Sequence, residues 1–276
     1  MKITAKICVF LLLSALLAGC GETVAPTETT AQTQPTETAE VIETTAATQP
    51  PEPITTQAAL EAALAENLRV VLEGDIRLTT GVVVKDHYLV GNGYKITAPA
   101  YDEADPETYC GIFLSKGTLE NITVWGGYRA IGTGADHRAT GDLRLTNVIA
   151  EGENCALYVG HGDLKGSVYV VDSEFYGQTV YNKVTHASFE NCTFGFNDSG
   201  SRGNITAYAD TTLIGCRFKD MEGKKYTISF SSKVDGMTMV LEDCYYGDTL
   251  ITQENITNLL KVKPNSNTIA VRNTIG

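Results

Sequence analysis

The stretch Phe189-Glu190-Asn191-Cys192-Thr193-Phe194 contains the pattern on which this chain of 276 residues is built. The pattern returns as Leu213-Ile214-Gly215-Cys216-Arg217-Phe218 and again as Leu241-Glu242-Asp243-Cys244-Tyr245-Tyr246. Each copy has an apolar residue, any residue, then Asn, Asp or Gly, a small or apolar residue, any residue, and an aromatic residue. We call this six-residue pattern the template.

Looser copies of the template continue upstream, at residues 119–124, 145–150 and 170–175. The fourth positions of the six copies are 122, 148, 173, 192, 216 and 244, so successive copies lie 19 to 28 residues apart. A period of this size predicts one structural unit per copy, each covering the open face of its neighbour.

The repeating unit is built from short strands. Its apolar stretches, such as 112–114 and 226–230, are rich in β-branched and aromatic residues and are separated by Gly, Asn and Asp. A unit that returns to the same register stacks parallel strands about 4.8 Å apart. The third template position suits a left-handed bend, and stacked Asn side chains there would hydrogen-bond along the column.

These features, over about residues 54 to 246, resemble the right-handed parallel β-helix of the pectate-lyase-like superfamily. Beyond the period, the matching features are the Asn column and the turn Gly91-Asn92-Gly93, which is similar to an early turn of many such proteins. The resemblance implies an all-β solenoid. It does not fix an activity, because this fold hosts lyases, hydrolases, adhesins and inert spacers.

Both ends of the solenoid require a cover. Thr55 and Thr56 are candidate N-caps for a helix of about three turns that would close the first coil. The first strands are expected at residues 69–72, 75–78 and 82–84. A short helix at 252–260 and a final strand at 268–272 are expected to close the far end.

The N-terminus predicts export and a lipid anchor. Lys2 and Lys6 precede an apolar run at 7–18, which is typical of a secretory signal. The run ends Leu17-Ala18-Gly19-Cys20, which closely resembles the bacterial lipobox. The resemblance implies removal of residues 1–19, diacylation of Cys20 and attachment to the extracellular side of the cell membrane through a diacylglyceryl anchor. The alternative is an ordinary signal peptide with an incidental Cys.

Residues 20–53 are predicted to be a disordered tether that carries the lipidated Cys at its start, because a segment rich in Thr, Ala, Glu, Pro and Gln cannot build a core. Residues 54–276 then form the β-helix domain with its caps. The chain has a net charge of −12, of which about −8 falls on residues 54–276. Such a surface repels nucleic acid and makes a polyanionic ligand less favourable unless a cation bridges the two.

Five cysteines lie in the domain: Cys110, Cys155, Cys192, Cys216 and Cys244. The odd number rules out complete pairing within one chain. The last three share the fourth template position, so they are predicted to stack inside the cylinder as free thiols, with one disulfide in the column as the alternative. Without a CxxC pair, we predict no metal at these thiols.

Three histidines are candidates for chemistry. His161 and His186 each follow the fourth template position by thirteen residues, and His137 and Asp163 follow it by fifteen. Together with Lys183, they would share one flank and suit general acid–base work or cation binding. The simpler interpretation is a polar row of turns in which histidine is incidental.

Aromatic residues are the second set of candidates. Outward rings stack on sugar faces, and we expect such rings at Trp125, Tyr128, Tyr158 and Tyr181. The aromatic template positions, Phe175, Phe194, Phe218 and Tyr246, are expected to fill the interior. Residues 101–107 form an acidic loop that would suit Ca²⁺ but matches no cation motif, so a solvated loop and no cofactor are predicted.

Known catalytic motifs of the resembled superfamily are mostly missing. Gly160-His161-Gly162 matches one motif of polygalacturonase-like enzymes, but the paired Asp and the Arg-Ile-Lys are absent. No Arg shortly precedes a Pro, as it does in pectate lyases. The sequence therefore favours a non-catalytic surface module that binds glycan or wall material, or acts as an adhesin-like spacer. The alternative is a polysaccharide lyase or glycoside hydrolase with an unfamiliar site on the histidine flank.

Overall fold

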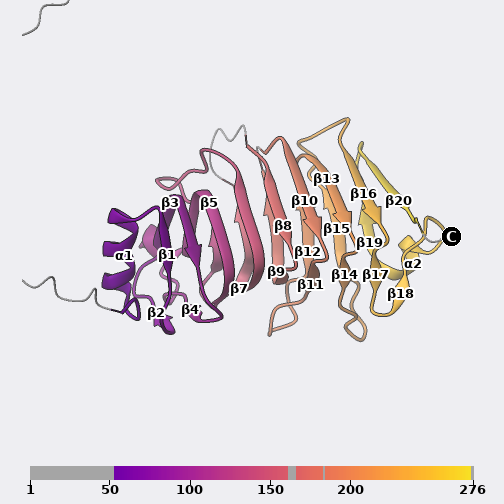
Figure 1. Ribbon diagram of the computed structural model, residues 1–276. Coiled ribbons are helices and arrows are strands. Elements are labelled where there is room, and N and C mark those ends of the chain that lie inside the picture. Colours follow the sequence, from indigo (N-terminus) through magenta and orange to yellow (C-terminus); the bar gives the residue numbers. More distant parts are fainter. Residues whose placement is uncertain (1–52, 161–165, 183, 275–276) are drawn as a thin grey trace, which may run out of the picture. The chain divides into compact units, whose positions relative to one another are not determined.

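A computed structural model describes residues 53–160, 166–182 and 184–274. These residues form a right-handed parallel β-helix, in which strands far apart in the sequence lie side by side (Figure 1). The described strands are β1 (Arg69–Val71), β2 (Ile76–Arg77), β3 (Val82–Val90), β4 (Lys95–Thr97), β5 (Cys110–Trp125), β6 (Arg129–Gly132), β7 (Leu143–Val159), β8 (Val168–Val171), β9 (Glu174–Tyr181), β10 (His186–Glu190), β11 (Thr193–Gly195), β12 (Asn204–Ala207), β13 (Asp210–Ile214), β14 (Arg217–Phe218), β15 (Thr227–Phe230), β16 (Thr238–Glu242), β17 (Tyr245–Tyr246), β18 (Thr249–Leu250), β19 (Lys261–Lys263) and β20 (Thr268–Arg272). The helices are α1 (Gln57–Glu66), the 3-10 turn η1 (Pro106–Thr108) and α2 (Ile256–Leu259).

The strands pair into three parallel ladders, which make three faces of a prism. Face 1 runs through β1, β3, β5, β7, β8, β10, β13, β16 and β20. Face 2 runs through β2, β4, β5, β7, β9, β11, β14 and β17. Face 3 runs through β3, β5, β6, β7, β9, β12, β15 and β19. The longest strands bend at a corner and contribute to more than one face, so one repeat of the sequence is one coil.

The corner between face 1 and face 2, which we call the asparagine corner, confirms the predicted column. Its third-position residues all have a left-handed backbone, with φ between 49° and 61°: Asn121, Asn147, Asp172, Asn191, Gly215 and Asp243. The Asn147 Nδ2 donates to Asn121 Oδ1 at 3.0 Å, and Asn191 Nδ2 donates to Asp172 Oδ1 at 3.3 Å. The template is therefore the sequence of a turn that repeats in register.

The interior behind this corner is filled by the sixth template position. Phe175, Phe194 and Phe218 are buried and stack along face 2, with ring centroids 5.9 Å and 5.5 Å apart. The prediction that Tyr246 fills the interior was only partly correct, because this ring is half-buried and its hydroxyl donates to Asp220 Oδ1 at 2.6 Å. Tyr246 belongs to the last strand of face 2: β17 pairs with β14 on one side, and its other described partner is the short antiparallel β18.

The five cysteines from residue 53 onward are free and buried, which agrees with the free thiols predicted for the three that share a template position. Cys192, Cys216 and Cys244 occupy successive coils, and each Sγ–H donates to backbone carbonyls of its own coil and the preceding one at 3.3–3.7 Å. The fourth template position therefore points into the cylinder.

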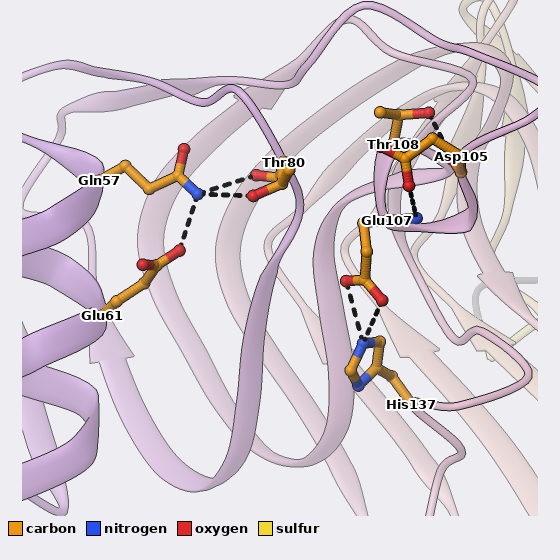
Figure 2. Close-up of polar contacts among 7 residues, drawn as sticks. All are labelled: Gln57, Glu61, Thr80, Asp105, Glu107, Thr108 and His137. Atoms are coloured by element: carbon orange, nitrogen blue, oxygen red, sulfur yellow. Dashed lines mark hydrogen bonds and ion pairs between the residues drawn. The ribbon is translucent and has the colours of Figure 1, made fainter.

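Both caps are present. The Thr56 hydroxyl accepts from the Ala59 amide at 3.2 Å and begins α1, whose Leu60 and Leu64 are buried over the first coil. Gln57 joins α1 to the loop after β2, with its Nε2 donating to Thr80 Oγ1 at 2.9 Å (Figure 2). At the far end, β20 has the predicted bounds, but α2 is shorter than predicted.

The reason for the short α2 lies in the residues before it. The Asn255 Oδ1 accepts from the Thr252 amide at 2.7 Å, so residues 252–255 form a side-chain-closed turn before the helix begins.

Candidate functional site

The predicted histidine flank lies at the corner between face 3 and the next coil's face 1. His161, Asp163 and Lys183 fall outside the described residues, as does Cys20. His137 and His186 both belong to this corner, but the register of β7, β8 and β10 places their turns two coils apart, about 10 Å along the solenoid. The described part therefore places these two predicted histidines apart on one flank.

His137 is held by the acidic loop. Its Nε2 lies 3.2 Å from both carboxylate oxygens of Glu107 (Figure 2). The His137 ring also lies 4.6 Å from the Phe113 ring. Two other acids of this loop accept backbone hydrogen bonds: Asp102 Oδ1 from the Ala104 amide and Asp105 Oδ1 from the Glu107 amide. In the described ranges, no three His, Cys, Asp or Glu side chains gather in a metal-binding group.

One of the four aromatic predictions was wrong. Tyr181 is fully buried, and its hydroxyl is 2.9 Å from Thr211 Oγ1. Strand alternation explains the error, because Tyr181 lies in register with the buried Ala207 and Phe230 on face 3 and points inward with them. Its ring fills the cylinder and cannot contact a ligand.

Tyr158 and Tyr128 are half-buried and belong to one aromatic cluster. The Arg129 guanidinium lies 3.7 Å from the centroid of the Tyr158 ring and 5.6 Å from that of Tyr128. Tyr128 in turn stacks on Tyr101, with centroids 4.5 Å apart and planes at 22°. The cluster fixes the ring of Tyr101, a residue that the sequence interpretation assigned only to the acidic loop.

Trp125 does face solvent and opens onto a pocket. Its side chain is 44% exposed, and with Tyr101 it borders a cavity of about 450 Å³ at the corner between face 2 and face 3. The other walls are the turns that carry Glu151 and Glu153, and the tip of the loop at 197–199. We call this cavity the tryptophan pocket.

The register explains why these residues meet. Trp125 and Glu151 are direct partners between β5 and β7. Each is three residues beyond the fourth template position, and the same column continues through Tyr176 and Gly195. The residue that follows each six-residue template copy belongs to this outward column. Extending the template by one position would therefore have predicted Glu151 as an outward residue.

The loop between β11 and β12 completes the pocket and is built around Asn197. This side chain is buried; its Nδ2 donates to Glu153 O at 2.7 Å, and its Oδ1 accepts from the Ser201 and Arg202 amides at 3.1 Å. The loop is thereby fixed over the turn below it. The Asp198 amide then donates to Glu151 Oε1 at 2.9 Å.

The carboxyl group of Glu151 is perturbed by this packing. Burial raises the pKa of Glu151 above its ordinary value, and the nearby Asp198 carboxylate raises it further, although the Asp198 amide and the Trp125 indole oppose the shift. Two close carboxyl groups beside an exposed indole can accept hydrogen bonds from hydroxyls, and one of them can hold a proton. The sequence interpretation missed both acids.

No helix among the described residues has the length and apolar character needed to cross a bilayer. No family model matches the chain, and no curated protein matches it. Among solved structures, that of rice weevil pectin methyl esterase is similar to this chain at 13% sequence identity, with a TM-score of 0.37, over 81% of this chain and 89% of that one. The fold assignment comes from the strand pairing described above.

Proposed function

We infer that this protein is a lipid-anchored surface protein whose β-helix binds glycan without cleaving it. The lipobox-like end of the leader, with Cys20 as the acylated residue, and the Thr-rich tether support the anchor and a position outside the cell membrane. The fold provides a rigid rod that presents its corner loops to a wall or matrix polymer.

The observation that carries the proposal is the tryptophan pocket. An indole that is 44% exposed, next to a Tyr101 ring fixed by stacking, offers flat apolar surface to the face of a sugar ring. Glu151 and Asp198 stand at the edge of that surface and suit the acceptance of hydrogen bonds from sugar hydroxyls. A concave site with aromatic walls and a few convergent polar groups is the usual form of a small-ligand site.

A glycan array followed by titration calorimetry tests this proposal. We expect Trp125→Ala to lower the affinity for the best-binding glycan by about tenfold or more, which corresponds to a loss of about 1.4 kcal/mol. Tyr169→Ala is the matched control, because this half-buried aromatic lies on face 1, in a different ladder from Trp125. Equal binding by the parent, Trp125→Ala and Tyr169→Ala would contradict the proposal.

The anchor is tested separately by Cys20→Ser. The parent is expected in the membrane fraction with an incorporated fatty acid, and the variant without either. An unprocessed, unacylated parent would contradict this half of the proposal while leaving the glycan site untouched.

A second candidate function is a carbohydrate-active enzyme at the same pocket. The observation in its favour is the raised pKa of Glu151 beside a second carboxyl group, which is the property a general acid needs. Product analysis on any glycan that binds separates the two functions. A new reducing end or an unsaturated product that Glu151→Gln abolishes supports the enzyme, whereas an intact ligand supports the binding module.

A further inference from the structure

The loop between β11 and β12 borders a second pocket of opposite charge. Asn197, Asp198 and Ser199 face the tryptophan pocket, whereas Phe196, Gly200 and Ser201 of the same loop line a cavity of about 670 Å³ on its other side. Three lysines line this second cavity and no described carboxylate does. We call it the lysine pocket.

The three lysines come from different parts of the fold. Lys261 lies beside Thr227 in the β15–β19 pairing of face 3. Lys224 and Lys225 come from the loop before β15; the Lys224 ammonium donates to Gly200 O, and the Lys225 ammonium to Thr257 O at 3.2 Å. These two bonds tie the walls of the cavity together.

Much of the hydrogen-bonding capacity of these ammonium groups is unused. Each has three donors, and Lys224 and Lys225 each give one to a carbonyl. Lys261 has no side-chain partner among the described residues, and none of the three forms an ion pair there. Three like charges around one cavity therefore lack a counter-charge from the protein.

This concentration of positive charge stands out on a chain with a net charge of −12. A concave wall lined by one sign of charge focuses the potential and attracts the opposite charge. The hydroxyls of Ser201, Thr227 and Thr257 also line the cavity and add neutral donors. Ammonium and hydroxyl donors around one cavity suit an oxyanion, either a phosphate or a carboxylate.

We propose that the lysine pocket binds the phosphate or carboxylate groups of an acidic glycan whose sugar rings occupy the tryptophan pocket across the loop. This inference rests on the proposed function and specifies its ligand class. It also revises the expectation that the negative net charge makes a polyanionic ligand unfavourable. The net charge of about −8 on the domain is unevenly distributed, and the lysine pocket provides a cationic site.

The test is a titration of purified full-length protein with three oligosaccharides of similar length: an oligouronate, a phosphorylated oligosaccharide and a neutral oligosaccharide. We expect one of the two anionic probes to bind, with an affinity that falls as salt is added. The double variant Lys224→Gln/Lys261→Gln is expected to lose about tenfold or more of that affinity. Lys233→Gln is the matched control and should bind like the parent. It removes an exposed lysine from the loop between β15 and β16, at the corner between face 3 and the next coil's face 1.

Lys261→Gln alone guards against a folding artefact, because Lys261 has no side-chain partner to lose; it is expected to weaken the anionic probe with an unchanged melting temperature. The inference is overturned if neither anionic probe binds, or if the double variant binds as well as Lys233→Gln does. Loss of binding in the lysine variants with none in Trp125→Ala would uphold the lysine pocket and reject the glycan site at Trp125. The reverse pattern would reject the lysine pocket alone.

Discussion

The asparagine corner and the corner between face 2 and face 3 are made by the same coils yet behave in opposite ways. At the asparagine corner, every turn from Asn121 to Asp243 has a left-handed residue, Asn, Asp or Gly, at the same template position. At the other corner, the connections range from the short bend at 152–154 within β7 to loops such as 98–109 and 196–203. One corner repeats, whereas the other varies and carries both candidate pockets.

The difference shows which structural requirements produce a repeating residue pattern in the sequence. A tight turn stacked on its neighbours must fit their backbone, so its residue type recurs in each coil. A loop that projects from the stack does not have to match the backbone of the coils beside it. A single side chain can hold it in place, as Asn197 does through its bonds to the Glu153 carbonyl and the Ser201 amide. Variation without loss of the fold is therefore possible at the corner that bears the pockets.

The sharpest way to test this contrast compares two phenylalanines that lie two residues apart. Phe194 is a template residue, buried between Phe175 and Phe218, and Phe194→Ala is expected to lower the free energy of unfolding by about 3–5 kcal/mol. Phe196 is a half-buried loop residue, and Phe196→Ala should cost clearly less. Chemical denaturation measures both, and equal losses would refute the distinction between template and loop.

A smaller effect is expected within the asparagine corner itself. Asn147 has a φ of 52°, a left-handed backbone that Asn tolerates better than Ala because its short polar side chain can hydrogen-bond locally. Asn147→Ala removes that side chain and is expected to cost about 1–2 kcal/mol. Asn147→Gly loses the bond to Asn121 but keeps the permitted backbone, so it should be the milder change. If the two variants lose equal stability in denaturation experiments, the bond to Asn121, which both of them lack, matters more than the left-handed bend.

The smallest effect is expected at the pocket corner and depends on pH. Because folding raises the pKa of Glu151 above its ordinary 4.5, the fold favours the neutral acid. The associated stability is present below pH 4.5 and is lost as the pH rises through the folded-state pKa. Glu151→Gln should therefore melt like the parent in acid and above it at about pH 7. If the melting temperatures of Glu151→Gln and the parent differ most in acid, this prediction is contradicted.

The sequence was sufficient to predict the solenoid because the template records a backbone requirement. The left-handed turns, the buried Phe194 and the stacked thiols all follow from residues at fixed template positions. Tyr181 was misplaced because it lies outside the template, where the inward and outward positions of face 3 had no marker in the sequence.

The pockets were harder to predict because their parts meet through loops. Glu151 and Asp198 are 47 residues apart and come together only because the loop anchored by Asn197 folds back over two coils. Lys224, from the loop before β15, and Lys261, on β19, line one cavity because β15 and β19 pair side by side. Trp125 was found because the one Trp of the chain is informative on its own, whereas a single acid or lysine among many is not.

The most direct test of this account is the affinity of Trp125→Ala and Asn147→Ala for the best glycan from the array, measured by calorimetry at a temperature where both variants are folded. The account predicts that Trp125→Ala loses about tenfold or more and that Asn147→Ala, although less stable, binds like the parent. Unchanged binding by Trp125→Ala, or a comparable loss in folded Asn147→Ala, would contradict the assignment of binding to one corner and of structure to the other.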